Sequence, residues 1–125
     1  MNVRCLFACL LLVLLSAAQY TEGATHEDFK RQHIDEGKNM KEGDCQKVID
    51  NKTIRDINNK YKPINTFILE MDEKVIKVCT DGSKDMFNLI VCELGADSKY
   101  TGTKKTARIR ISCRDGLPVH FSTDI

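Results

Sequence analysis

Histidine is the side chain that most readily exchanges a proton near neutral pH, and the chain has three of them. His26 lies among charged residues, in the expected first turn of a helix, and we interpret it as a solvated surface residue. His33 shares a predicted helix face with Phe29, and His120 lies in the segment PVHF, in a strand expected to be largely buried. Considered singly, each histidine fits a structural role better than a catalytic one.

Four of the six cysteines follow the N-terminal segment, at Cys45, Cys79, Cys92 and Cys113. The gaps between them are 34, 13 and 21 positions, whereas a zinc site usually includes two closely spaced cysteines. An even number of cysteines in a small exported domain indicates disulfide bonds. The spacing leaves all three possible pairings of the four cysteines open.

Residues 1–23 have the pattern of a secretory signal peptide. A basic N-terminus precedes an apolar run over 6–15, and small residues follow, so we expect cleavage after Ala18 or Gly23. The rest of the chain, 24–125, has the size of one domain. No stretch in it is apolar for long enough to cross a membrane, so we expect a secreted, extracellular protein.

The charge is nearly balanced, with a formal net charge of +1. Such a charge gives little long-range attraction to anionic surfaces and disfavours a bactericidal role through bulk charge. The basic run KKTARIR at 104–110 fits a surface that binds RNA or a polyanion, and it fits a solvated hairpin equally well. Asn51 begins the sequon Asn-Lys-Thr, a predicted glycosylation site.

Helical and alternating hydrophobic patterns follow each other along the chain, which is typical of an α+β domain. Helices are predicted over 25–36, 44–50 and 72–78, and strands over 65–71, 87–94, 106–113 and 119–123. The pattern therefore places His33 on the first helix, Lys62 before the first strand and His120 in the last strand.

Three separated segments resemble the pancreatic ribonuclease family. They are RQHID at 31–35, KPINTF at 62–67 and GLPVHF at 116–121, and the last looks closest to the angiogenin branch. The resemblance covers essentially the whole domain. It implies three short helices packed on a V-shaped antiparallel sheet, with disulfides Cys45–Cys92 and Cys79–Cys113 as the two bridges retained.

The resemblance implies cleavage of single-stranded RNA on the 3′ side of pyrimidines, with neither a metal ion nor a cofactor. RNA carries its own nucleophile, the 2′-OH, so the enzyme supplies a base, an acid for the leaving 5′ oxygen, and a cation for the transition-state charge. By the match of the motifs, His33 is the base, His120 the acid and Lys62 the cation. The first product would be a 2′,3′-cyclic phosphate.

Neighbouring residues of the same motifs would contact the substrate. The resemblance implies that Gln32 and the backbone N–H of Phe121 reach the phosphate, and that Thr66 pairs with the pyrimidine edge. Asn65 would steady the backbone of the site. For Asn65 and Thr66, a plain position at a strand edge is the alternative.

The chain also departs from the family pattern. Ser122 stands where an aspartate usually orients the acid histidine, and Asp28 stands where a lysine usually lies near a flanking phosphate. Tyr61 replaces a cysteine whose disulfide anchors the backbone before Lys62, and the partner cysteine, expected near 99–103, is absent too. We predict that Tyr61 packs on that hairpin, and that a more mobile Lys62 makes the enzyme slow.

Two functions of different classes follow. One is a secreted endoribonuclease of low turnover. The other is an angiogenin-like signalling or host-defence factor whose ribonuclease activity is weak or secondary. The expected partner is single-stranded RNA, with a cell-surface receptor or polyanion and a ribonuclease inhibitor as further candidates, and the chain is expected to be a monomer.

Overall fold

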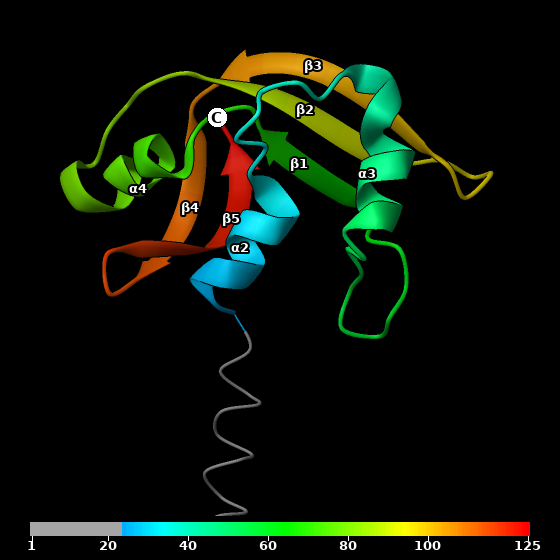
Figure 1. Ribbon diagram of the computed structural model, residues 1–125, viewed down its shortest axis with the longest axis horizontal. Helices are drawn as coiled ribbons and strands as arrows, with labels where there is room; N and C mark the ends of the chain where they lie inside the picture. Colours follow the sequence, from blue (N-terminus) through cyan, green and yellow to red (C-terminus); the bar gives the residue numbers. More distant parts are fainter. Residues whose placement is uncertain (1–23) are drawn as a thin grey trace, which may run out of the picture.

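The computed structural model describes residues 24–125, and the segment interpreted as a signal peptide lies outside the described residues (Figure 1). The helices are α2 (His26–His33), α3 (Cys45–Asn51) and α4 (Asp72–Asp81), with a short 3₁₀ helix, η1 (Glu42–Asp44), before α3. The strands are β1 (Ile64–Ile68), β2 (Phe87–Leu94), β3 (Tyr100–Ala107), β4 (Ile109–Arg114) and β5 (Leu117–Asp124). The predicted α+β fold is confirmed.

The strands form two antiparallel sheets that run in different directions (Figure 1). One has the order β1-β2-β3, and the other contains β4 and β5. The chain crosses between the sheets at Arg108, so the single strand predicted over 106–113 is wrong. The alternating pattern continues across the end of β3 and the start of β4, because Ala107 and Ile109, on either side of Arg108, are both buried. The pattern therefore gives no sign that the strand ends there.

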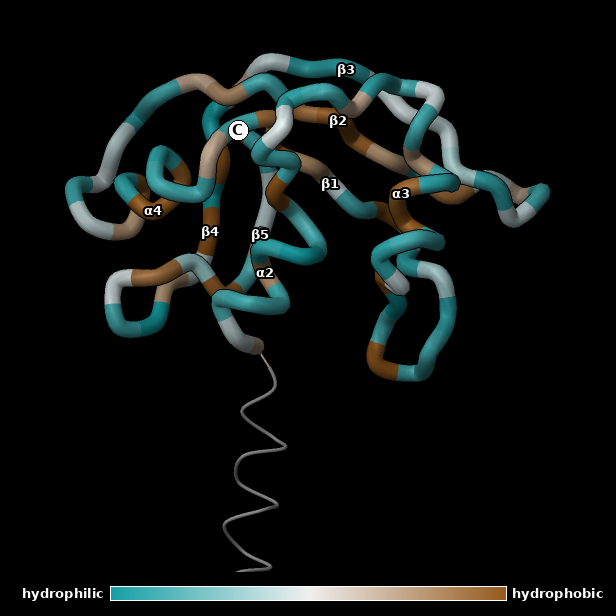
Figure 2. Tube along the Cα trace, in the orientation of Figure 1, coloured by the Kyte–Doolittle hydropathy of each residue, from teal (hydrophilic) through white to brown (hydrophobic). Residues whose placement is uncertain are grey.

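The apolar side chains form two cores. Figure 2 shows the hydrophobic positions along the trace, including most of β2. Along β2, Phe87 and Leu89 face one core, whereas Ile90 and Cys92 face the other, because successive side chains of a strand point to opposite faces. This burial on both faces explains why the strand is a nearly continuous apolar run and why its bounds agree with the prediction.

Helix α2 carries Gln32 and His33 and packs against β1 and β5. It is eight residues long, so packing rather than intrinsic helix propensity stabilises it. The predicted helix over 25–36 is too long. Ile34 is already extended and bridges to Ile68 of β1, and the N–H of Asp35 donates to the carbonyl of Ile68. A long-range pairing, and not Gly37, therefore ends the helix.

His26 is not the solvated residue predicted from its charged neighbours. Its Nδ1 lies 2.9 Å from the carbonyl oxygen of Pro118 in β5, and its Nε2 lies 2.8 Å from the Asp72 carboxylate at the start of α4. The partners lie 92 and 46 positions away along the sequence. His26 thus joins three elements and fixes α2, which carries His33, against the strand that carries His120.

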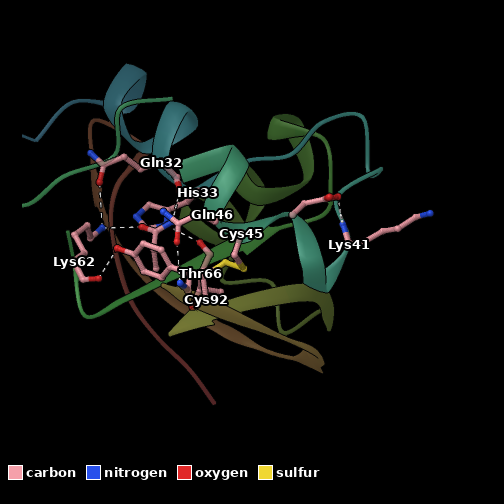
Figure 3. The surroundings of a disulfide bond; sticks show 11 residues. Gln32, His33, Lys41, Cys45, Gln46, Lys62, Thr66 and Cys92 are labelled. Carbon is pink, nitrogen blue, oxygen red and sulfur yellow. Dashed lines mark hydrogen bonds between the residues drawn. A yellow bond between two sulfur atoms is a disulfide. The ribbon is translucent and has the colours of Figure 1, made fainter. Parts of the chain in front are cut away.

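Two disulfides cross-link the domain, Cys45–Cys92 and Cys79–Cys113, which are the pairs that the family resemblance implies. The first joins α3 to β2 in the buried core (Figure 3). Gly102, opposite Cys92 in β3, makes this approach possible, because a Cβ atom there would lie 2.2 Å from the carbonyl oxygen of Glu42 and 2.8 Å from the Cys45 sulfur.

The helices found within residues 24–125 are too short or too polar to cross a membrane.

Candidate active site

His33, the last residue of α2, is buried with 8% of its surface exposed. Its ring packs against those of Phe29 and Phe121, with centroids 5.2 and 5.3 Å away. Its Nδ1 donates to the carbonyl oxygen of Thr66 at 2.8 Å, because a carbonyl oxygen can only accept. In the neutral ring, Nε2 therefore keeps its lone pair.

Burial lowers the pKa of His33 from 6.5 to about 4, against the opposing effect of the hydrogen bond to Thr66. The nearby charges of Lys62 and His120 lower this pKa further. A histidine with such a pKa is neutral at pH 7. The His33 side chain is thus a preformed base with one basic nitrogen available.

Lys62 precedes β1 and points toward α2, where Figure 3 shows it near Gln32 and His33. Its Nζ donates to the side-chain oxygens of Asn65, at 2.8 Å, and Gln32, at 3.2 Å. The Asn65 amide in turn donates to the backbone carbonyl of Gln32 at 2.9 Å. Burial lowers the pKa of Lys62, and the charge of Arg31 adds to this effect. Side-chain amides thus hold the ammonium group in one position.

His120 lies in β5, opposite Ser112 of β4. The sequence predicted a largely buried strand, but the side chain of His120 is exposed. Strand β5 belongs to a two-stranded sheet, and its register with β4 shifts between the pairs Ser112–His120 and Cys113–Pro118. This irregularity interrupts the simple alternation, so Pro118 is buried while His120, two positions later, is exposed. An exposed imidazole can exchange protons with both solvent and substrate.

Two grooves meet at these residues, and four side chains line both: His33, Lys62, His120 and Phe121. The groove that we call the α2 groove has a volume of about 580 Å³ and also contains Gln32, Arg55 and Ile57. The one that we call the β1 groove has a volume of about 190 Å³ and also contains Asn65, Thr66 and Thr123.

The predicted site residues other than Asn51 and the cysteines are therefore brought together. Asn51 is the exposed last residue of α3.

The sequence model of the pancreatic ribonuclease family matches residues 24–122. The chain belongs to this family. Among its relatives is Amphinase-2 of Lithobates pipiens, which is 30% identical over 102 residues, covering 76% of this chain and 88% of that protein. The chain is therefore a ribonuclease, an enzyme whose substrate is RNA.

Solved structures of ribonucleases share the fold. Green turtle egg white ribonuclease gives a TM-score of 0.72 at 28% identity, covering 80% of this chain and 98% of that one. Zebrafish RNase5 gives a TM-score of 0.71, also at 28% identity, covering 78% of this chain and 91% of that one. These likenesses show the family, whereas membership of the angiogenin branch stays a hypothesis.

Tyr61 packs on the hairpin between β2 and β3, as predicted, but the contact is one part of a larger cluster in this ribonuclease. Its ring lies edge-on to that of Tyr100, with centroids 5.4 Å apart, and the Arg55 guanidinium lies 4.3 Å from its centroid. The Tyr61 hydroxyl donates to Asp50 at 2.6 Å, and this hydrogen bond raises the pKa of Tyr61. The Gln46 amide donates to the same hydroxyl at 3.0 Å.

Tyr100 connects this cluster to the site, because its hydroxyl donates to the carbonyl oxygen of Lys62 at 2.6 Å. The backbone before β1 is thus held by side chains where the family pattern has a disulfide. Thr101 and Thr103 are poor positions for a restored cysteine, because their side chains alternate to the face opposite Tyr100. Sequence reasoning missed Arg55 and Tyr100, since neither residue belongs to a motif.

We expect Tyr100→Phe to lower kcat/KM for RNA cleavage by about tenfold, because a shift of about one ångström in a catalytic group costs up to about a hundredfold. The loss of one hydrogen bond should reduce the free energy of unfolding by only about 1 kcal/mol. Tyr61→Phe is the matched control, since it removes a hydroxyl from the same cluster without touching Lys62. Equal kcat/KM values for Tyr100→Phe and the wild type would show that Lys62 is positioned by other contacts.

Proposed function

We propose that the chain is a secreted ribonuclease that cleaves single-stranded RNA on the 3′ side of pyrimidines, leaving a 2′,3′-cyclic phosphate. One observation carries the proposal. A buried neutral histidine, an exposed histidine and a hydrogen-bonded lysine line the same two grooves. These are the base, the acid and the cation that attack by the ribose 2′-OH requires.

In the proposed reaction, Nε2 of His33 takes the proton of the 2′-OH as the 2′ oxygen bonds to phosphorus. The bond from phosphorus to the 5′ oxygen breaks, and His120 donates a proton to that oxygen. The Lys62 ammonium, fixed by Gln32 and Asn65, stabilises the additional negative charge on the phosphoryl oxygens. Hydrolysis of the cyclic phosphate then uses the two histidines in exchanged roles.

The β1 groove is the proposed site of the pyrimidine. Thr66 and Thr123 line it, and a threonine hydroxyl can donate or accept, so it can pair with either uracil or cytosine. The groove is small, about 190 Å³, which favours a single-ring base over a purine. Gln32 and the backbone N–H of Phe121 are proposed to contact the phosphate.

Secretion is part of the proposal because the domain contains two disulfides, which form and persist in oxidising compartments. The signal-like pattern of residues 1–23 points to the same compartment.

The pH profile of kcat/KM is expected to decline on its acid side at an unusually low pH. A general base must be unprotonated to act, and the pH dependence of kcat/KM reports the protonation of the free enzyme. The value of kcat/KM should therefore persist as the pH falls from 7, and it should decline only as His33 is protonated, near pH 4. An ordinary histidine would give this decline near pH 6.5. A pH profile of kcat/KM for a dinucleotide, with unfolding monitored in parallel, checks the prediction. An acid limb near 6.5 in folded protein would contradict it.

The proposal is tested by comparing two dinucleotides, one with a pyrimidine and one with a purine on the 5′ side of the phosphate, in a buffer containing EDTA. We expect cleavage of the first only, with a 2′,3′-cyclic phosphate as the initial product. Equal cleavage of both would contradict the pyrimidine preference, and a linear phosphate without a cyclic intermediate would contradict the mechanism.

A further inference from the structure

The loop between α3 and β1 projects away from the three-stranded sheet and is hydrophilic along most of its length, with one hydrophobic stretch at its far end (Figure 2). The loop contains Ile57, whose surface is 98% exposed. Single exposed apolar residues are common and need no explanation by themselves. Ile57, however, lines the α2 groove together with His33, Lys62 and His120.

Hydrogen bonds within the loop hold Ile57 in this position. The N–H of Asp56 donates to the carbonyl of Lys60 at 2.8 Å. The Asp56 carboxylate accepts from the N–H groups of Asn58 and Lys60, at 2.8 and 2.9 Å. Asn59 takes a left-handed conformation, with φ of 63°, and closes the turn. These bonds fix the backbone on both sides of Ile57, and the loop therefore presents its apolar side chain beside the catalytic residues.

A fixed cation lies beside Ile57 in the same groove. The Arg55 guanidinium stacks on the Tyr61 ring, and it donates to the carbonyl of Ile54 and to Asp50. These two bonds occupy two of its five N–H donors. The two acidic side chains of the groove are already engaged, Asp28 with Arg31 at 3.4 Å and Asp56 with its own loop. The groove can thus accept an anionic ligand with an apolar part.

We propose that Arg55 and Ile57 form a subsite for the second RNA nucleotide downstream of the cleaved bond, one position beyond the end of a dinucleotide substrate, with its base against Ile57 and its phosphate near Arg55. The inference rests on the proposed function. If the pyrimidine occupies the β1 groove and His120 protonates the leaving oxygen, the leaving strand departs through the α2 groove, which is the other groove lined by the same catalytic residues. A flat base covers an aliphatic side chain well, and this contact depends little on sequence.

The test compares two substrates with the same pyrimidine–purine step, a dinucleotide and a hexanucleotide extended on the 3′ side. Ile57→Ala should lower kcat/KM for the hexanucleotide by about three- to tenfold, the effect of losing part of one buried aliphatic contact. It should leave the dinucleotide unchanged. Ile57→Trp should raise kcat/KM for the hexanucleotide. Because Ile57 is almost fully exposed, neither variant should impair folding. Met86→Ala, at an exposed residue outside both grooves, is the matched control.

Equal effects of Ile57→Ala on both substrates, or no effect on either, would overturn the subsite. A second arm measures binding of a hexanucleotide with 2′-deoxyribose at the cleavage position, by fluorescence anisotropy. This binding measurement does not require cleavage. A protein that cuts neither substrate would contradict the proposed function, but weaker binding by Ile57→Ala would still test the subsite. Vesicle binding that depends on Ile57, with unchanged RNA binding, would assign the residue to a lipid surface and overturn the inference.

Discussion

His120→Ala is expected to lower kcat/KM for RNA cleavage by about a hundred- to ten-thousandfold, the range typical of a lost general acid. The exposed position of His120 means that the free energy of unfolding should hardly change. His33→Asn should cause a loss of similar size. Its side-chain amide can still donate to the Thr66 carbonyl, but it has no basic nitrogen to take the 2′ proton. Single-turnover cleavage of a dinucleotide, with circular dichroism as a check on folding, measures both.

Lys62→Ala should also lose most of the rate, and Lys62→Arg should recover part of it, because the charge is restored with a different geometry. Asn51→Ala is a suitable control, since Asn51 is exposed at the end of α3, outside both grooves. A His120→Ala enzyme with wild-type kcat/KM would exclude this residue as the acid and would remove the proposed mechanism.

Removal of the Cys45–Cys92 disulfide is expected to have the largest effect on stability. The bridge closes a loop of 47 residues, which contributes about 4 kcal/mol through the entropy of the unfolded chain. Both cysteines are buried in the core, so Cys45→Ala with Cys92→Ala also leaves a cavity. Total stabilities of small domains are about 5–15 kcal/mol, so the double variant should lose a large part of its free energy of unfolding and have a much lower melting temperature.

The second bridge provides the comparison. Cys79–Cys113 spans 34 residues and has a similar entropic contribution, but Cys113 is exposed. Cys79→Ala with Cys113→Ala should therefore destabilise the domain by less than the first double variant does, as measured by chemical denaturation. A larger loss from the exposed bridge would mean that strain or residual unfolded-state structure, and not burial, decides the difference.

The sequence predicted best where a local pattern and a buried environment agree. Strand β2 was bounded correctly because its apolar run is buried on both faces. Helix α4 begins at Asp72 as predicted but extends three residues past Val78, to Asp81, where Gly82 takes a left-handed conformation. The motifs placed His33, Lys62 and His120 in order along the chain, and the fold brings them to the same grooves.

Long-range contacts account for what the sequence did not predict. The end of α2 depends on Ile68, the role of His26 on Asp72 and Pro118, and the anchoring of Lys62 on Tyr100. In each case the partner is at least 34 positions away. A periodic pattern reports only local geometry, so it contains no information about such partners.

The central claim is that RNA is cleaved by its own 2′-OH, with His33 and His120 moving the protons. One measurement tests it most directly: the cleavage rate of an oligoribonucleotide with one pyrimidine–purine step, against the same oligonucleotide with a single 2′-deoxyribose at that pyrimidine. We expect the first to be cut at that step, with a 2′,3′-cyclic phosphate as the product, and the second to resist cleavage there. Cleavage of both at similar rates would contradict the account.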